Sequence, residues 1–483
     1  MLKPEIKNRL IEIVGTENFL NSKEDRITYS YDGTPIISNL PEAVIKPKTV
    51  QELSSIMKIA NQEKIAIVPR GSGTGLSGGS VPIENSIVIT LNHWNKIIEI
   101  DKENLTILVE PGVITGQIHS EVEKLGLFYP PDPGSAAICT IGGNVAENAG
   151  GIRGLKYGVT KDYVMGLEVV TPEGNILKTG GKVVKDVAGY NLKDLFIGSE
   201  GTLGIITKIL LKLIPYPEVT KTILVYFSKL EEAAKTVSDI IAAKILPSAL
   251  EFLDKTTIKC VEDFAHLGLD TNIDALLLIE VDGYKDIAEK EAEKVLDICK
   301  KNNCSYIELA KDSNHANKLR AARKVAFSAL ARIKPTTILE DATVPRSEIA
   351  KMIVGINNIA SKYNLTFGIF GHAGDGNLHP TCLTDERNLE EIKRAESAFE
   401  EIFELAISLG GTITGEHGVG LSKKKFLNKV VGKDGLEIMM KIKEALDPNV
   451  IMNPGKVFSI SSKSEKLRGD KERFKRFILE EWI

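Results

Sequence analysis

Glycine is distributed very unevenly along this chain of 483 residues, and that pattern constrains the fold more than any other feature. Most of the 41 glycines crowd into five stretches, at residues 71–79, 134–158, 174–204, 368–376 and 410–420. Glycine allows tight turns and leaves backbone N–H groups open to a ligand. Ordinary helix and strand patterns lie between the stretches. The sequence therefore predicts a scaffold of regular elements whose loops carry binding sites.

Composition narrows the class of protein. The length is typical of two or three domains with large cores. The 61 Lys and Arg against 65 Asp and Glu give a formal net charge of -4, so no chain-wide basic surface for nucleic acid is expected. The five cysteines form neither a disulfide framework nor a four-cysteine metal motif. Without a signal peptide or a run of about 18 uncharged apolar residues, a cytoplasmic protein lacking a transmembrane segment is expected.

The pattern of elements changes near residues 214–217, IPYP. Before this point short strands alternate irregularly with helices, and after it longer helices separate strands such as 275–281 and 365–370. We therefore expect an α+β fold with a domain boundary near residue 217. The predicted parts are residues 1–217 (core about 37–216), 218–458 and a tail at 459–483, with long helices at 228–245, 287–301, 349–363 and 390–409.

The tail ends in an amphipathic pattern. Phe474, Phe477, Ile478 and Trp482 share one helical face, and Lys and Arg occupy the other. Two interpretations stay open: the helix docks on its own protein, or it contacts a partner or a membrane surface.

The densest glycine loop is PRGSGTGLSGG, residues 69–79. Gly73 to Gly78 match the dinucleotide pattern G-x-G-x-x-G, but that motif requires a helix directly after it. Here Ser80, Val81 and Pro82 follow, and then a strand pattern, so a Rossmann site is excluded. The loop is either a flexible connection or a nest of N–H groups for phosphate, and its composition favours the nest.

Two more loops in the same half carry a similar signature. The first contains PPDPGS (130–135), TIGGN (140–144) and NAGG (148–151), where stiff prolines and small residues suit a large planar ligand. The second is GSEGTLGIIT at residues 198–207, a turn that feeds a strand. Three such loops in one domain indicate a single extended ligand with phosphates and a ring system.

In this order and spacing the three loops resemble the FAD-binding domain of vanillyl-alcohol oxidase type flavoproteins. The chain is most similar to the branch with the glycolate oxidase D subunit, D-lactate dehydrogenase and D-2-hydroxyglutarate dehydrogenase, from about residue 30 to 458. The resemblance implies a two-subdomain FAD-binding domain of the PCMH type, followed by an α+β substrate domain with an antiparallel sheet. Many relatives attach FAD covalently to a histidine in the first loop; this loop has Ser72 and neither His nor Cys, so non-covalent FAD is expected.

The resemblance also assigns cofactor positions. Arg70 to Gly75 would hold the pyrophosphate, Ile206 the adenine end, and Asn453 would lie near the flavin. The full expected set is Pro69, Arg70, Gly71, Ser72, Gly73, Thr74, Gly75, Leu76, Pro133, Gly134, Ser135, Ile141, Gly142, Gly143, Asn144, Asn148, Gly150, Gly151, Glu200, Gly201, Ile206 and Asn453.

Histidines and a carboxylate gather in two glycine loops of the second half. In GHAGDGNLH (371–379) the Gly-Asp-Gly-Asn turn predicts a hairpin that brings His372 and His379 together. The loop GEHGVG supplies Glu416 and His417. Two histidines and a carboxylate suit a divalent metal, although spacing alone leaves structural histidines equally open. The resemblance assigns His372, His379 and Glu416 as ligands of Zn, Mn or Fe, and His417 as catalytic base.

The substrate carboxylate needs a cation. By resemblance Arg323 is favoured, whereas Arg320 one helical turn away is the alternative. Asp341, in EDATVP, receives no role.

Together with these residues, the resemblance implies an FAD-dependent dehydrogenase that oxidises a small D-2-hydroxy acid, D-lactate or glycolate, with hydride transfer to flavin N5. The chain has no iron–sulfur motif, so the acceptor is expected to be another molecule. The candidates that the resemblance implies are an electron-transferring flavoprotein, an iron–sulfur subunit or a quinone, and peripheral membrane contact stays open. The alternatives are an oxidase that uses O₂ and a non-catalytic FAD electron-transfer subunit.

Overall fold

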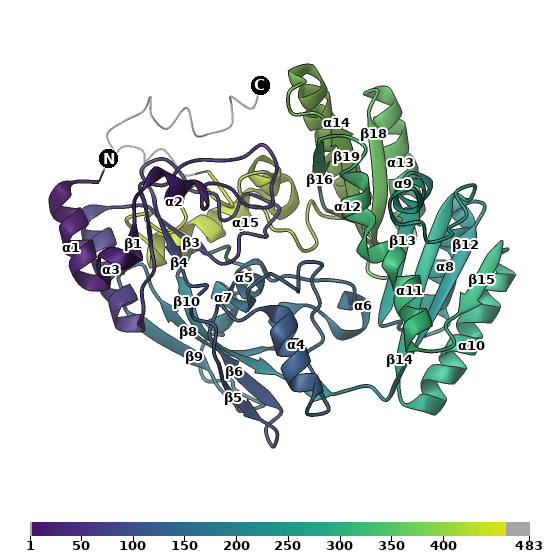
Figure 1. Cartoon of the computed structure of the whole chain (residues 1–483), viewed down its shortest axis with the longest axis horizontal. Helices are drawn as coiled ribbons and strands as arrows, with labels where there is room; N and C mark the ends of the chain where they lie inside the picture. Colours follow the sequence, from purple (N-terminus) through teal and green to yellow (C-terminus); the bar gives the residue numbers. More distant parts are fainter. Residues whose placement is uncertain (1, 460–483) are drawn as a thin grey trace.

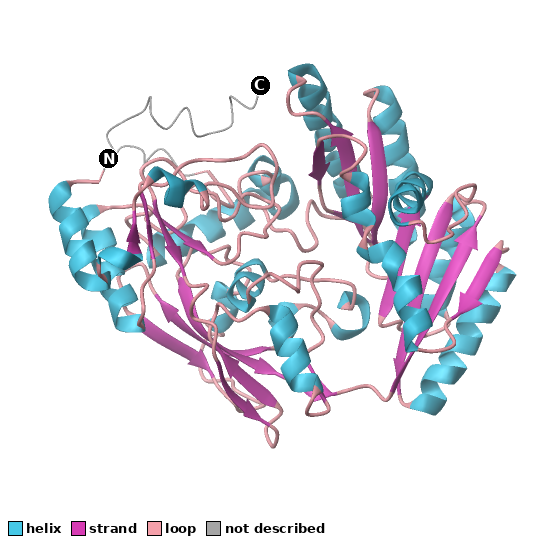
Figure 2. Cartoon of the chain, viewed as in Figure 1, coloured by secondary structure: helices cyan, strands magenta, loops and turns pink. Residues whose placement is uncertain are grey.

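A computed structural model describes residues 2–459 of the chain (Figure 1). The predicted amphipathic tail at 459–483 lies outside the described residues, apart from Ser459. Two groups of elements form the described part: three sheets from the first half, one of them with only two strands, and one large sheet with its helices from the second half (Figure 2).

The N-terminal residues build a small mixed sheet. Its order is β1-β2-β4-β3, in which β2, β4 and β3 are parallel and β1 is antiparallel to β2. Helices α1 and α3 pack on it through side chains such as Leu10 and Leu53. Thr49 caps α3 by accepting a hydrogen bond from Glu52 N at 3.1 Å. The bounds are α1 Pro4–Val14, β1 Phe19–Leu20, α2 Lys23–Ile27, β2 Ala43–Ile45, α3 Val50–Glu63, β3 Ile67–Arg70 and β4 Ile87–Thr90.

A five-stranded antiparallel sheet completes the first half, with the order β5-β6-β10-β8-β9. Helices α4 and α5 bury Ile118 and Ile141 against it. The bounds are β5 Ile97–Asp101, β6 Thr106–Val109, α4 Thr115–Glu123, β7 Leu127–Phe128, α5 Ile141–Glu147, α6 Gly154–Tyr157, β8 Val164–Val170, β9 Ile176–Gly180, α7 Lys193–Phe196, β10 Ile205–Lys212 and β11 Ile214–Pro215.

The second half forms one antiparallel sheet with the order β15-β12-β14-β13-β18-β19-β16, and β17 pairs with β19. Helices α8, α10, α13 and α14 cover one face, and α9, α11 and α12 cover the other (Figure 2). The bounds are β12 Val219–Phe227, α8 Leu230–Ala242, β13 Ala249–Asp254, α9 Lys255–Ala265, β14 Ala275–Gly283, α10 Lys285–Lys301, β15 Tyr306–Leu309, α11 Ser313–Lys324, α12 Ala326–Leu330, β16 Thr336–Leu339, β17 Ala342–Thr343, α13 Ile349–Lys362, β18 Thr366–His372, β19 Asn377–Thr384 and α14 Leu389–Ser408.

The chain then returns to the first half. Helix α15 (Lys424–Leu446) places Ile442 and Leu446 against the core of the five-stranded sheet. Met452 forms a parallel bridge with Ile67 of β3. The last described residues thus pack with the N-terminal elements, as the yellow ribbon in Figure 1 shows.

The α+β class with an antiparallel second sheet is confirmed. The four long helices and the hairpin at residues 371–379 are observed, whereas α15 was not predicted. Gly432, at φ 71°, breaks the helical geometry inside α15, so no single apolar stripe runs along it. Among residues 2–459, no helix combines the length and the apolar composition needed to cross a membrane.

Candidate active site

A cavity of about 1140 Å³ lies between the loops of the first half and the face of the large sheet that carries α11 and α12. Its walls combine the three glycine loops with side chains from β13, β14, β18 and β19. Leu278, Leu339 and Phe370 supply apolar surface on the second side. A cavity of this size accepts a ligand larger than most drug-sized molecules.

Most of the expected cofactor positions line this cavity. The lining residues among them are Pro69, Arg70, Gly71, Ser72, Gly73, Thr74, Gly75, Leu76, Pro133, Gly134, Ser135, Gly142, Gly143, Asn144, Glu200, Gly201 and Ile206. The remaining five, Ile141, Asn148, Gly150, Gly151 and Asn453, are not among the lining residues.

Three of these five positions have structural contacts that explain their place in the sequence. Ile141 is buried in the core, and Asn453 donates from Nδ2 to the carbonyl oxygens of Gly79 and Glu200. A Cβ on Gly150 would lie 2.7 Å from Glu416 Oε2, so this glycine leaves room for the carboxylate. Their direct contact with a cofactor stays a prediction.

The buried side chain of Arg70 supports the first glycine loop. Its Nη1 donates to Tyr31 O at 2.6 Å, and the side chain is buried. A Cβ on Gly73, which has φ +72°, would lie 2.1 Å from Arg70 Nη2. Only glycine therefore lets the loop fold over the guanidinium.

The three predicted metal ligands converge on one point. Glu416 Oε1 lies 3.2 Å from His372 Nε2 and 3.3 Å from His379 Nε2. A tetrahedral ion at about 2.0 Å from each ligand would hold them about 3.3 Å apart. The spacing and the donor types therefore fit a divalent cation.

The charges around the trio agree with a cation site. Burial lowers the pKa of His372, but Glu251 and Glu416 outweigh it and raise that pKa well above its usual value. Burial raises the pKa of Glu416, but His372 and His379 bring it well below the usual value. Without metal, a protonated His372 thus lies between two carboxylates, and a metal ion would replace that proton.

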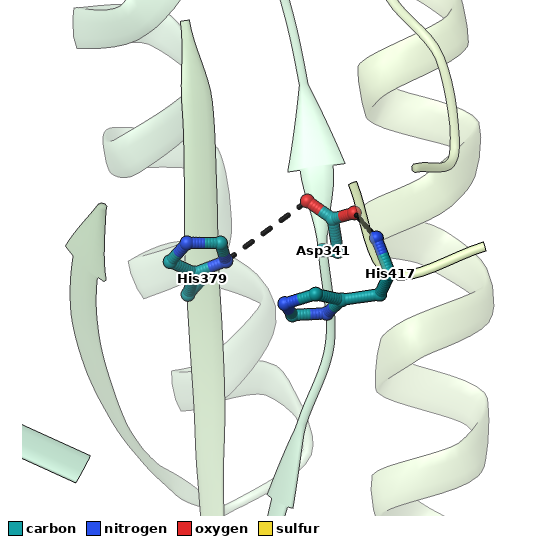
Figure 3. Close-up of side chains that lie close together, drawn as sticks. All are labelled: Asp341, His379 and His417. Atoms are coloured by element: carbon teal, nitrogen blue, oxygen red, sulfur yellow. Dashed lines mark hydrogen bonds and ion pairs between the residues drawn. The ribbon is translucent and has the colours of Figure 1, made fainter. Parts of the chain in front are cut away.

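His417 lies beside the trio, and Asp341 holds its loop (Figure 3). The imidazole rings of His417 and His379 stack with centroids 5.0 Å apart. Burial, with smaller effects from His379 and Lys423, lowers the pKa of His417 to about 4. His417 is therefore neutral near pH 7, the state in which an imidazole accepts a proton.

Asp341 is buried, and its Oδ2 accepts four hydrogen bonds from residues 414–417. They come from Thr414 Oγ1 and from the backbone N–H groups of Gly415, Glu416 and His417, at 2.7–3.0 Å. One carboxylate oxygen thus fixes the loop that carries both Glu416 and His417. Burial raises the pKa of Asp341, but His417, Lys423 and His379 bring it below its ordinary value.

The two candidate arginines differ in their free hydrogen-bonding groups. Arg320 uses all three nitrogens within the protein, toward Glu280, Asn317 and Thr222. Arg323 donates from Nε to Glu251 at 2.5 Å, and its two terminal nitrogens have no hydrogen-bond partner among residues 2–459. Its guanidinium lies 4.9 Å from the centroid of the Phe370 ring. Arg323 therefore presents the bidentate edge that a carboxylate needs.

Comparisons with known proteins match this architecture. Residues 41–180 match an FAD binding domain family, and residues 216–457 match the C-terminal domain of FAD linked oxidases. The chain belongs to the FAD-linked oxidase family. The family expected from the three glycine loops is thereby confirmed.

Similar members of this family align over nearly the whole chain. Glycolate oxidase subunit GlcD of Bacillus subtilis (strain 168) is 55% identical over 95% of this chain and 98% of its own. D-lactate dehydrogenase of Anaerostipes hadrus is 36% identical over 94% and 97%. A solved structure of p-cresol methylhydroxylase with substrate bound has a TM-score of 0.78 at 20% identity over 96% and 97%, which supports the fold.

FAD fits the cavity of this FAD-linked oxidase. The first two loops meet where a Cβ on Gly71 would lie 2.2 Å from Thr140 Oγ1, so bare backbone forms the wall. Thr140 caps α5 by accepting a hydrogen bond from Gly143 N, and Gly142 and Gly143 both line the cavity. The wall combines the backbone of the glycine loops with apolar surface, which suits a cofactor with phosphates and a ring system.

Two carboxylates of the site were not predicted from the sequence: Glu251 was not considered, and Asp341 received no role. Glu200 lines the cavity, and its role as a cofactor position stays a prediction. Its side chain also accepts hydrogen bonds from Val419 N and Gly420 N, both at 2.7 Å, so it connects the third glycine loop to the loop of His417. The segment EDATVP was the only signal for Asp341, and it carries no spacing rule.

Replacing Asp341 by Asn is expected to slow flavin reduction by substrate about 10–100-fold. The substitution removes the charge that four donors share and loosens the Glu416–His417 loop. Rapid-mixing absorbance under anaerobic conditions measures this rate. Thr414→Val removes one donor only and serves as control, with an expected change below about threefold. Equal effects of the two substitutions would contradict this role of Asp341.

Proposed function

We propose that this FAD-linked oxidase dehydrogenates a small D-2-hydroxy acid, D-lactate or glycolate, to the 2-oxo acid. One observation carries the proposal: the cofactor loops, the free terminal nitrogens of Arg323 and His417 all line the same cavity. The candidate metal ligands lie beside His417 in that cavity. The names of two relatives, a glycolate oxidase subunit and a D-lactate dehydrogenase, support the same substrate class.

Each group at the site has a part in this reaction. The three glycine loops would hold FAD without a covalent link, and the cofactor would supply N5 as the acceptor for the hydride of the substrate Cα. A divalent cation (Zn²⁺, Mn²⁺ or Fe²⁺) held by His372, His379 and Glu416 would lower the pKa of the substrate hydroxyl. His417, neutral and half-buried beside the trio, accepts the hydroxyl proton. Arg323 binds the carboxylate through its two terminal nitrogens and fixes its orientation.

The electrons then leave for another molecule. We infer an acceptor protein, either an electron-transferring flavoprotein or an iron–sulfur subunit, or a quinone. The word subunit in the name of the Bacillus relative supports an assembly with further chains. The dehydrogenase proposal therefore predicts slow reoxidation by O₂ and fast reoxidation by an artificial dye.

An anaerobic titration tests the proposed reaction. The flavin absorbance of the purified protein is followed with D-lactate, L-lactate, glycolate and D-2-hydroxyglutarate. Bleaching by D-lactate or glycolate, and not by L-lactate, is the expected result. A yellow protein that none of these acids bleaches would overturn the proposal and favour a non-catalytic electron-transfer role.

A further inference from the structure

One buried glutamate links the two halves of the proposed chemistry. Glu251 lies in β13, paired with Leu278 of β14 and with His372 of β18. Glu251 is 1% exposed and lines the cavity. A carboxylate in this position needs hydrogen-bond partners or cations, because burial of an unpaired charge is costly.

The two oxygens of Glu251 serve different partners. His372 Nδ1 donates to Oε1 at 2.7 Å, and Arg323 Nε donates to Oε2 at 2.5 Å. This bond keeps a proton on Nδ1, so Nε2 is the nitrogen left for a metal ion held together with Glu416. The hydrogen bond from Arg323 Nε to Glu251 leaves the two terminal nitrogens of Arg323 free to bind a carboxylate. Glu251 thus orients an imidazole ligand and a guanidinium from one rigid strand.

We propose that Glu251 is a positioning residue that sets, through one carboxylate, both the metal-binding orientation of His372 and the carboxylate-binding orientation of Arg323. This inference rests on the proposed function. In a 2-hydroxy acid the hydroxyl and the carboxylate are on adjacent carbons, so their two anchors must keep a fixed separation. A single shared carboxylate provides that constraint. Binding and catalytic groups must lie within about 0.5 Å of their productive positions, because larger displacements reduce affinity and rate.

The neighbouring strand provides a matched control. Glu280 of β14 also lines the cavity and accepts a hydrogen bond from an arginine Nε, that of Arg320, at 2.6 Å. Its side chain also accepts a hydrogen bond from Thr222 Oγ1, at 2.6 Å. Glu280 therefore has the same chemistry and a similar place in the sheet, but among residues 2–459 it forms no hydrogen bond or ion pair with His372 or Arg323.

The test compares Glu251→Gln and Glu280→Gln in the full-length FAD-loaded protein. Equilibrium dialysis measures the affinity for Zn²⁺, and the perturbation of flavin absorbance by oxalate in metal-depleted protein measures anion binding. A glutamine at 251 can accept from one partner only and turns an N–H₂ group toward the other. We expect about 10–100-fold weaker Zn²⁺ binding and at least about tenfold weaker oxalate binding. Glu280→Gln should change each affinity less than about twofold.

A second variant keeps the test decisive if Glu251→Gln does not fold. Glu251→Asp keeps the charge, but its shorter side chain cannot span both partners, so at least one affinity should fall about tenfold while FAD remains bound. The proposal fails if Glu251→Gln weakens only one of the two affinities, or if Glu280→Gln weakens both equally. Wild-type protein that binds no Zn²⁺ would overturn both this inference and the metal part of the proposed function. Normal wild-type binding with unaffected Glu251 variants would overturn the inference alone.

Discussion

Replacing His417 by Asn lowers the rate of flavin reduction by substrate about 10²–10⁴-fold, the usual contribution of a positioned general base. His417 is the one imidazole among residues 2–459 that lines the cavity without belonging to the His372, His379 and Glu416 trio. Its pKa of about 4 keeps it neutral, so it has a lone pair for the hydroxyl proton near pH 7. Anaerobic rapid-mixing absorbance at saturating substrate measures the rate.

The matched control is His119→Asn. This histidine also has a pKa lowered by burial, but its Nε2 lies 2.9 Å from Pro131 O and it does not line the cavity. We expect its rate within about threefold of wild type, because it contacts no reacting group. FAD content and Zn²⁺ binding of His417→Asn should match wild type. A rate unchanged by that substitution would remove His417 from the mechanism.

Replacing Arg323 by Met is expected to lower kcat/KM about 10³-fold. The guanidinium offers two charge-assisted hydrogen bonds of roughly 2 kcal/mol each, and about 1.4 kcal/mol corresponds to a factor of ten. Steady-state kinetics with an artificial dye, over a range of D-lactate concentrations, measures the loss. Arg320→Met should cost less than about tenfold, since Glu280, Asn317 and Thr222 already occupy that side chain.

The order of these two effects decides between the arginines. If Arg320→Met proved the more damaging, the substrate carboxylate would bind at Arg320, and the free edge of Arg323 would need another explanation. A Glu280→Gln, Arg320→Met double variant separates loss of binding from the strain of an unpaired Glu280, because it leaves no buried carboxylate behind.

Much of the fold follows from local patterns. The Gly-Asp-Gly-Asn turn between apolar runs predicted the β18–β19 hairpin, which does bring His372 and His379 together. The helices α8, α10, α13 and α14 carry clear apolar stripes, so their positions were predictable. Helix α15 was not, because Gly432 interrupts it and its partners lie in the first half of the chain.

The site depended on contacts that spacing does not encode. Glu251 lies in the apolar run ALEFLD, which carries no motif, and its partner His372 is 121 residues away. The choice between Arg320 and Arg323 rests on which nitrogens are already bonded, a property of packing alone. The glycine loops predicted where the cofactor wall lies, but not that the side chain of Glu200 binds the His417 loop.

The proposed oxidation needs a divalent cation held by His372, His379 and Glu416 next to His417. The most direct measurement is the anaerobic absorbance of the wild-type flavin with D-lactate and glycolate, before chelation, after chelation and after restoring Zn²⁺ or Mn²⁺. We predict bleaching that chelation abolishes and the metal restores, with FAD bound throughout. Bleaching at the same rate after complete removal of the metal would contradict the account.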